Sequence, residues 1–298
     1  MAMAVDYVFT GTAPALVTPF TEDNKVDLEA FRELVRWQIE GGVDALVVLG
    51  TTGENPTINH DERRALVDAA LEEANNEVPV IVGTGTNNTR QSITFSKEAE
   101  TAGADGLLVV GPYYNKPTQD GFRQHVAAIA DASDCPIIVY NVPGRTSFNI
   151  TAQTMLQIAE EIPTVVGSKE ASGNIAQISD ILAYRPDHLA VYAGDDEMAF
   201  PLISLGADGV ISVISNVLPQ VFSDFIQDAM DGNANEARSG HFSLLQAMRA
   251  CFVGTNPLPV KYLLAKQQRM EAKARLPLGE LSEGQKREIE EAFEPHPA

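Results

Sequence analysis

A lysine and a tyrosine at the ends of two apolar runs are the residues of this sequence best suited to chemistry. Lys169 lies in VVGSKEASGN, and Tyr140 opens YNVPGRT. A lysine is a nucleophile at neutral pH only when its ammonium form is disfavoured, and the end of a buried strand supplies the necessary desolvation. A tyrosine on a neighbouring strand end can move the protons that imine chemistry requires. Local sequence alone favours a solvated Lys169–Glu170 surface pair, because lysine is seldom buried, so the surrounding elements must decide.

Short β-rich runs alternate with longer helical patterns along most of the chain. Most runs are continuously apolar, as expected of strands covered on both faces. Amphipathic stretches lie between them, and Asn59 with Glu62 has the spacing of a capping box, which predicts a helix start there. The eight runs are TAPALVTPF, DALVVLGTT, VPVIVGTG, GLLVVGPYY, PIIVYNVP, TVVGSKEA, LAVYAGDD and GVISVISN. Eight strand-then-helix units predict an α/β fold, the (β/α)8 TIM barrel.

The end of the chain departs from this alternation. From about Val221 onward the pattern is helical, with no further convincing strand and no Gly/Ser linker. We therefore expect a catalytic barrel over residues 1–220 and a C-terminal helical extension over residues 221–298 that packs on it.

Composition narrows the class of protein. The chain has 298 residues, of which 44% are hydrophobic, and no apolar run is long enough to cross a membrane. Its start, MAMAVDYVF, lacks the pattern of a signal or transit peptide. Cys135 and Cys251 occur in unrelated contexts without a CxxC motif or a histidine cluster, which favours small core residues over a disulfide or zinc site. These features predict a soluble cytoplasmic protein.

The charge balance is strongly acidic. There are 41 acidic against 21 basic residues, a formal charge of −20. Such a field repels nucleic acid and anionic membranes, so neither is an expected partner. The carboxylates are dispersed over the helical segments, which suggests adaptation to high salt, where screening removes most of the self-repulsion.

Polar motifs follow four of the predicted strands. They are GTTGEN, GPYYNKP, YNVPGRT and GSKEASGN, after the second, fourth, fifth and sixth runs. The active site of such a barrel lies at the C-terminal ends of its strands. Lysine, tyrosine, threonine and arginine side chains are therefore expected to converge on one mouth, which favours the buried interpretation of Lys169.

These four motifs resemble those of the dihydrodipicolinate synthase and N-acetylneuraminate lyase family, class I aldolases that bind pyruvate as a Schiff base. The resemblance runs from about Gly11 to the C-terminus. The double threonine, the second tyrosine of PYYN and Arg145 resemble the synthase branch more than the sialic acid lyases. The resemblance implies condensation of pyruvate with aspartate 4-semialdehyde, the first committed step of lysine biosynthesis by the diaminopimelate route.

The resemblance also implies roles for individual catalytic residues. Lys169 would form the imine with pyruvate, so no separate cofactor is expected. Tyr140 would donate and accept protons, and Thr51 and Tyr114 would extend it into a hydroxyl chain reaching solvent. Tyr114 would act across a dimer interface, and the resemblance favours a homotetramer built from two tight dimers.

The remaining implied roles concern substrate binding. Thr52 would hold the pyruvate carboxylate with help from backbone amides of the GTTG turn. Arg145 would take the carboxylate of the second substrate by a two-pronged hydrogen bond, and Ile211 would line the pyruvate pocket. Asp195 and Asp196 suit a divalent metal by type, but without a third ligand at useful spacing we interpret them as loop and helix-cap carboxylates.

Two alternative functions stay open at this point. A retro-aldol lyase acting on a sugar acid, such as N-acetylneuraminate or a 2-keto-3-deoxy acid, would use the same Lys169 and Tyr140. Arg145 argues against it, because a polyhydroxylated aldehyde needs hydroxyl partners more than a guanidinium. A non-enzymatic binding protein is disfavoured because Thr51 and Tyr114 are also present.

One departure from the family concerns regulation. Lysine-inhibited relatives use a histidine pair and an acidic residue in a pocket at the dimer interface. Here His60 and Asn87 match that pattern, but Arg63 and Gln91 occupy the other two polar positions. Arginine repels the ammonium groups of lysine, and glutamine removes a countercharge. We therefore expect weak or absent inhibition by lysine.

Overall fold

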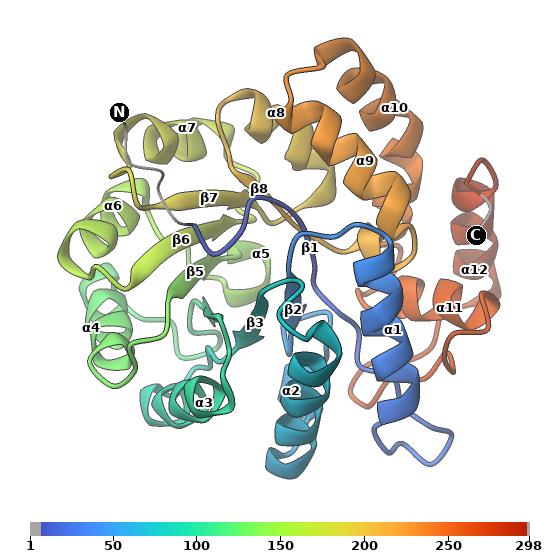
Figure 1. Ribbon diagram of the computed structural model, residues 1–298, viewed down its shortest axis with the longest axis horizontal. Helices are drawn as coiled ribbons and strands as arrows, with labels where there is room; N and C mark the ends of the chain where they lie inside the picture. Colours follow the sequence, from blue (N-terminus) through green and yellow to red (C-terminus); the bar gives the residue numbers. More distant parts are fainter. Residues whose placement is uncertain (1–6, 297–298) are drawn as a thin grey trace.

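A computed structural model describes residues 7–296, in which eight parallel strands form a closed barrel (Figure 1). Neighbouring strands pair in the order β1-β8-β7-β6-β5-β4-β3-β2. The gap between β1 and β2 is bridged by Ala15 and Val47, and the Leu16 amide donates to the Val47 carbonyl at 2.9 Å. The TIM barrel predicted from the sequence is confirmed. The strands are β1 (Gly11–Pro14), β2 (Leu46–Val48), β3 (Val80–Gly83), β4 (Gly106–Val110), β5 (Ile137–Asn141), β6 (Val165–Glu170), β7 (Ala190–Ala193) and β8 (Gly209–Ser212).

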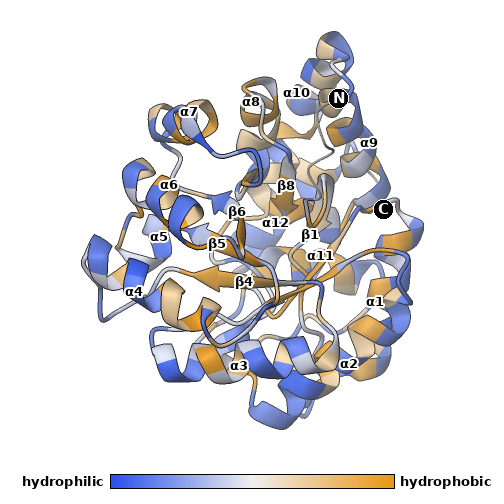
Figure 2. Cartoon of the chain, turned by 60° about the vertical axis from the view of Figure 1, so that its left-hand side comes forward, coloured by the Kyte–Doolittle hydropathy of each residue, from blue (hydrophilic) through white to orange (hydrophobic). Residues whose placement is uncertain are grey.

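The strands are apolar because both of their faces are covered. One cluster of buried side chains takes members from the strands and none from the helices, and therefore fills the inside of the barrel; it includes Ala13, Ile81, Ile138 and Tyr192. A larger cluster joins the outward-facing strand residues to the helices. Figure 2 shows the result, hydrophobic strands surrounded by helices whose outer faces are hydrophilic.

Helices alternate with the strands and surround the barrel. The capping box predicted at Asn59 is present, with the Asn59 side chain accepting from the Glu62 amide and the Glu62 side chain accepting from the Asn59 amide. The helices up to β8 are α1 (Leu28–Glu40), α2 (His60–Ala74), α3 (Thr89–Ala102), α4 (Gln119–Ala130), α5 (Pro143–Thr146), α6 (Ala152–Glu161), α7 (Ile175–Tyr184) and α8 (Ala199–Ser204), with 3-10 turns η1 (Asn55–Thr57) and η2 (Asp196–Met198).

Helices alone follow β8 in the described part of the chain. They are the 3-10 turn η3 (Ile214–Asn216) and α9 (Pro219–Met230), α10 (Ala234–Ala250), α11 (Leu258–Lys266) and α12 (Glu283–Phe293). Helix α9 packs on β1 and α1, so it completes the ring of barrel helices, whereas α10, α11 and α12 lie outside that ring (Figure 1). The boundary at residue 220 expected from the sequence falls at the start of α9, and the division into two units stays a prediction.

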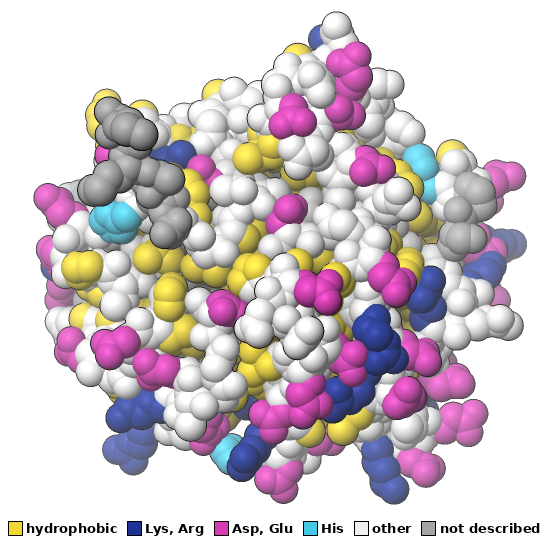
Figure 3. Space-filling view, in the orientation of Figure 1, with side chains coloured by type: hydrophobic (Ala, Val, Ile, Leu, Met, Phe, Trp, Pro, Cys, Tyr) yellow, Lys and Arg dark blue, Asp and Glu magenta, His cyan; other side chains and the backbone are white. Residues whose placement is uncertain are grey.

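The surface carries the acidic excess seen in the composition. Figure 3 shows acidic side chains spread over the visible face and outnumbering the basic ones. Cys135 and Cys251 are buried and unpaired, as expected of small core residues. Among residues 7–296, the structure contains no helix long and apolar enough to cross a membrane.

Candidate active site

Lys169 and Tyr140 face each other across two adjacent strands. They are direct partners in the register of β5 and β6, because Tyr140 pairs with Lys169 and Asn141 with Glu170. The Lys169 Nζ atom lies 4.3 Å from the centroid of the Tyr140 ring, and both residues are 5% exposed. The structure thus brings together the amine and the phenol that the sequence singled out.

Burial shifts the pKa of both groups. The pKa of Lys169 is lowered to about 7, chiefly by desolvation; Asp196 and Asp195 oppose this shift, and Arg145 contributes to it. Desolvation raises the pKa of Tyr140 to about 12, opposed by Arg145 and by a hydrogen bond with Thr51. At neutral pH the site therefore holds an amine that is substantially unprotonated beside a phenol that retains its proton.

The neighbouring strand leaves room for the lysine side chain. A Cβ atom added at Gly194, just after β7, would lie 3.1 Å from the Lys169 Cε atom and 2.9 Å from the Ala171 Cβ atom. Any larger residue would crowd the lysine stem. The position of the Lys169 side chain therefore depends on Gly194, the glycine of AGDD. The sequence analysis did not identify this residue.

A cavity of about 270 Å³ opens beside Tyr140, and Lys169 lies next to that tyrosine without itself lining the cavity. Tyr140 and Thr51 line it, together with Tyr113 and Arg145. Other walls come from the loop after β2 and from two segments of the C-terminal region, residues 256–257 and 277–278. The cavity has the size of a small-molecule site, and its lining combines apolar surface with a few polar groups.

The loop after β2 is a tight turn whose two threonines differ. The Glu54 amide donates to the Thr51 carbonyl at 3.1 Å, which closes the turn. Thr51 lines the cavity together with Tyr140 and lies close enough to the phenol to lower its pKa. Thr52 is buried and does not line the cavity; its hydroxyl accepts from the Asn256 side chain at 3.0 Å. The expected role of Thr52 in holding a carboxylate therefore stays a prediction.

Arg145 projects from the short helix α5 at the mouth of the cavity. It is exposed and lines the cavity, and within residues 7–296 its guanidinium makes no hydrogen bond or ion pair. Its charge nevertheless affects the pKa of both Lys169 and Tyr140. A planar cation with free donors is suited to binding a carboxylate by two parallel hydrogen bonds.

Two other predicted residues lie away from the cavity lining. Tyr114 is 93% exposed and has a positive φ of 69°, while the adjacent Tyr113 is the one that lines the cavity. Ile211 is fully buried inside the barrel, in the same apolar cluster as Tyr140. Within one chain, therefore, neither Tyr114 nor Ile211 lines the cavity, and Ile211 packs in the apolar interior of the barrel.

Asp195 and Asp196 act as capping carboxylates, as interpreted from the sequence. The Asp195 side chain accepts from the Glu197 amide at the start of η2. Asp196 is buried and accepts from the Ile214 amide at 2.9 Å. Burial raises the pKa of Asp196 to about 6. Sequence reasoning did not anticipate that this carboxyl, as an anion, favours the charged form of Lys169.

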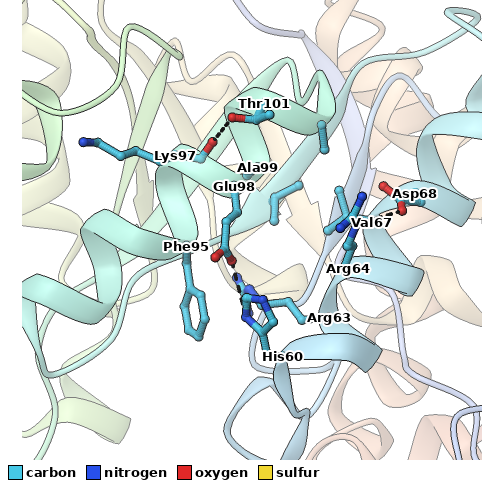
Figure 4. A pocket seen from close by; sticks show the side chains of 12 residues that line it. His60, Arg63, Arg64, Val67, Asp68, Phe95, Lys97, Glu98, Ala99 and Thr101 are labelled. Atoms are coloured by element: carbon cyan, nitrogen blue, oxygen red, sulfur yellow. Dashed lines mark hydrogen bonds and ion pairs between the residues drawn. The ribbon is translucent and has the colours of Figure 1, made fainter.

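A second cavity, of about 350 Å³, lies between α2 and α3 (Figure 4). Arg63 is buried there, with its guanidinium 3.9 Å from the centroid of the Phe95 ring. It donates to the Asn55 side chain at 2.6 Å and to the Gly83 carbonyl. His60 lies close by, with its Nδ1 atom 3.6 Å from a Glu98 carboxylate oxygen. Arg63, which departs from the family pattern, is thus held in a fixed position in the wall of this second cavity.

Comparisons of sequence and of structure with known proteins point to one family. A sequence profile of the dihydrodipicolinate synthetase family matches residues 8–295. A protein of Salinibacter ruber named 4-hydroxy-tetrahydrodipicolinate synthase is 61% identical over 94% of this chain and 93% of its own length.

Two solved structures have the same fold. The dihydrodipicolinate synthase of Thermotoga maritima has a TM-score of 0.94 at 44% identity, covering 97% of this chain and 98% of that one. The chloride-inhibited enzyme of Acinetobacter baumannii, solved in complex with pyruvate, has a TM-score of 0.94 at 38% identity, covering 96% and 98%. With matches this extensive in sequence and structure, the chain belongs to the dihydrodipicolinate synthetase family.

Proposed function

We propose that this chain is a 4-hydroxy-tetrahydrodipicolinate synthase that condenses pyruvate with aspartate 4-semialdehyde through an imine on Lys169. The observation that carries the assignment of Lys169 is its pairing with Tyr140 in a buried site that lowers the lysine pKa to about 7. The names of the relatives support the synthase over the sugar-acid lyase.

The first step is attack of the neutral Lys169 amine on the ketone carbon of pyruvate. The carbinolamine that forms must lose water, which requires a proton on the departing hydroxyl. Tyr140 retains its proton at neutral pH and lies beside the amine, so it is placed to supply that proton. The protonated imine then withdraws electrons, and loss of a proton from the methyl carbon gives the enamine that attacks the aldehyde.

Arg145 selects the second substrate. Its guanidinium lines the mouth of the cavity and is free to pair with the carboxylate of aspartate 4-semialdehyde. A sugar aldehyde offers hydroxyl groups instead and would leave this charge without a partner. The exposed cation thus supports the amino-acid aldehyde as the acceptor.

Tyr114 acts in the site of a neighbouring subunit in this proposal. The support is that its side chain is almost fully exposed on a backbone held at positive φ, a conformation that persists only where it is structurally or functionally required. Mixed dimers of Tyr114→Phe and Lys169→Ala chains test it. If Tyr114 acts across the interface, such dimers regain one complete site and part of the activity; if it acts within its own chain, they stay inactive.

Borohydride trapping tests the chemistry directly. Pyruvate and borohydride should give one stable adduct that maps to the peptide containing Lys169, and Lys169→Ala should give none. Assays with aspartate 4-semialdehyde, N-acetylmannosamine and simple sugar aldehydes then identify the acceptor. An adduct on another lysine would refute the mechanism, and turnover of sugar aldehydes alone would refute the substrate.

A further inference from the structure

A buried ion pair joins the loop after β2 to the C-terminal helical region. Lys261, on α11, donates to the Glu54 carboxylate, and the two residues are 1% and 3% exposed. They lie 207 positions apart in the chain. Glu54 is the last residue of the GTTGE motif and lines the cavity.

Both charges of this pair are fully engaged. The second Glu54 carboxylate oxygen accepts from the Arg275 amide at 2.9 Å. Lys261 Nζ also donates to the Lys273 carbonyl at 2.6 Å and lies 4.1 Å from the centroid of the Phe20 ring. A buried ion pair is a poor source of stability, because desolvation of the two charges offsets most of their attraction. The ion pair instead fixes the position of the Glu54 side chain relative to α11.

Glu54 belongs to a turn with a strained backbone, residues 51–54. Glu54 has a φ of 55°, which is unfavourable for a residue with a side chain and persists only where contacts enforce it. Its amide closes the turn onto the Thr51 carbonyl, and Thr51 lines the cavity together with Tyr140. The position of the Glu54 carboxylate thus fixes the backbone that carries Thr51.

The same region holds the turn at a second point. Asn256 precedes α11, and its side-chain amide donates to the Thr52 hydroxyl at 3.0 Å. On the barrel side, the Thr18 hydroxyl donates to the Gly53 carbonyl at 2.7 Å. Three consecutive residues of the turn are therefore anchored, and two of the anchors come from beyond the barrel.

We propose that Glu54 and Lys261 are positioning residues for the reaction, whose ion pair holds the turn of residues 51–54 so that Thr51 stays beside Tyr140 at the wall of the cavity. The C-terminal helical region is then part of the catalytic apparatus. This inference rests on the proposed function. It differs from a purely structural role because it predicts changes in the pyruvate half-reaction of protein that is fully folded.

The test compares single and double variants. Lys261→Met leaves a buried carboxylate without its cation, and Glu54→Gln leaves the ammonium without its anion, so both should lower stability. Glu54→Gln with Lys261→Met removes both charges and should recover much of that loss. The readouts are the melting temperature, the rate of imine trapping by pyruvate and borohydride, and the KM for each substrate.

If the two residues position the turn, the double variant should regain stability without regaining the rate of imine trapping. The rate of imine trapping should fall about 10- to 100-fold in all three variants, including the double variant that regains stability, because small displacements near the reacting groups have effects of this size. The KM for aspartate 4-semialdehyde should stay within about twofold, since Arg145 lies on a different loop. Glu54→Asp keeps the charge but shortens the side chain, and should also slow trapping.

Arg185→Met is the matched control. Arg185 pairs with Asp208 at the ends of α7 and β8 opposite to the cavity, so its loss should lower stability without slowing imine trapping. A double variant that regains both stability and rate would overturn the proposal. Unmodified protein that traps pyruvate on Lys169 but does not turn over aspartate 4-semialdehyde would reject the proposed function instead, and the trapping comparison would still decide the role of Glu54 and Lys261.

Discussion

The Lys169 amine lies 4.3 Å from the centroid of the Tyr140 ring, and its pKa is lowered to about 7, chiefly by burial. Below that pH the ammonium form predominates and cannot attack a ketone; above it the free amine does. The rate of imine trapping by pyruvate should therefore rise with pH, pass its midpoint near 7 and level off. A midpoint near 10, the ordinary range of lysine, would contradict this environment.

Arg145→Met should move that midpoint upward, because Arg145 lowers the pKa of Lys169. The same variant should raise the KM for aspartate 4-semialdehyde about 10- to 100-fold, the loss expected for a charge-assisted hydrogen bond. Arg145→Lys should restore the midpoint of the pH profile more fully than it restores the KM for aspartate 4-semialdehyde. An ammonium keeps the positive charge but cannot reproduce the two-pronged contact. Arg90→Met, an exposed arginine on α3, serves as the control and should leave both quantities unchanged.

Tyr140→Phe keeps the ring beside Lys169 but removes the hydroxyl that would donate the proton. Turnover should fall about 10²- to 10⁴-fold, the usual contribution of a positioned proton donor. Slow trapping of pyruvate on Lys169 should persist, because the buried amine remains. Stopped-flow trapping and steady-state assays separate these steps, and an unchanged kcat would remove Tyr140 from the mechanism.

Lysine should inhibit the enzyme weakly or not at all. The buried Arg63 guanidinium is held by Asn55 and the Gly83 carbonyl, and a cation fixed in that wall repels the two ammonium groups of lysine. Activity assays and calorimetry with added lysine check this. Submillimolar inhibition would show that lysine binds despite Arg63.

The dispersed acidic surface should make stability depend on salt. With a formal charge of −20, self-repulsion weakens the compact state at low ionic strength and is screened as salt rises. The melting temperature should therefore increase from low to molar KCl. Chloride is preferred to sulfate in this measurement, because sulfate stabilises most proteins through exclusion from their surface. A flat or falling curve would reject the high-salt hypothesis.

The sequence predicted those parts of the molecule that depend on local pattern. Continuous apolar runs revealed the strands, because a strand covered on both faces has no polar period. Lys169, Tyr140, Thr51 and Arg145 were found because each lies at or just after the C-terminal end of a strand, and parallel strands end at one rim.

The rest could not be predicted because it depends on contacts between distant segments. Asn256 and Lys261 reach the GTTGE turn across 204 and 207 positions, and no local pattern marks them. Asp196 was recognised as a cap but not as a charge acting on Lys169, since that effect depends on how β6 and β7 are packed. Thr52 was expected at the substrate, and its burial follows from the contact with Asn256.

The pairing of Glu54 with Lys261 also has a consequence for protein synthesis. The ribosome completes the turn bearing Thr51 early, whereas Lys261 is added more than two hundred residues later. All eight strands precede Lys261 in the chain, so a nascent chain can pair its strands and bury Lys169 before the turn receives this anchor. If the pair has the proposed positioning role, the full rate of imine formation is expected only after residue 261 has been added.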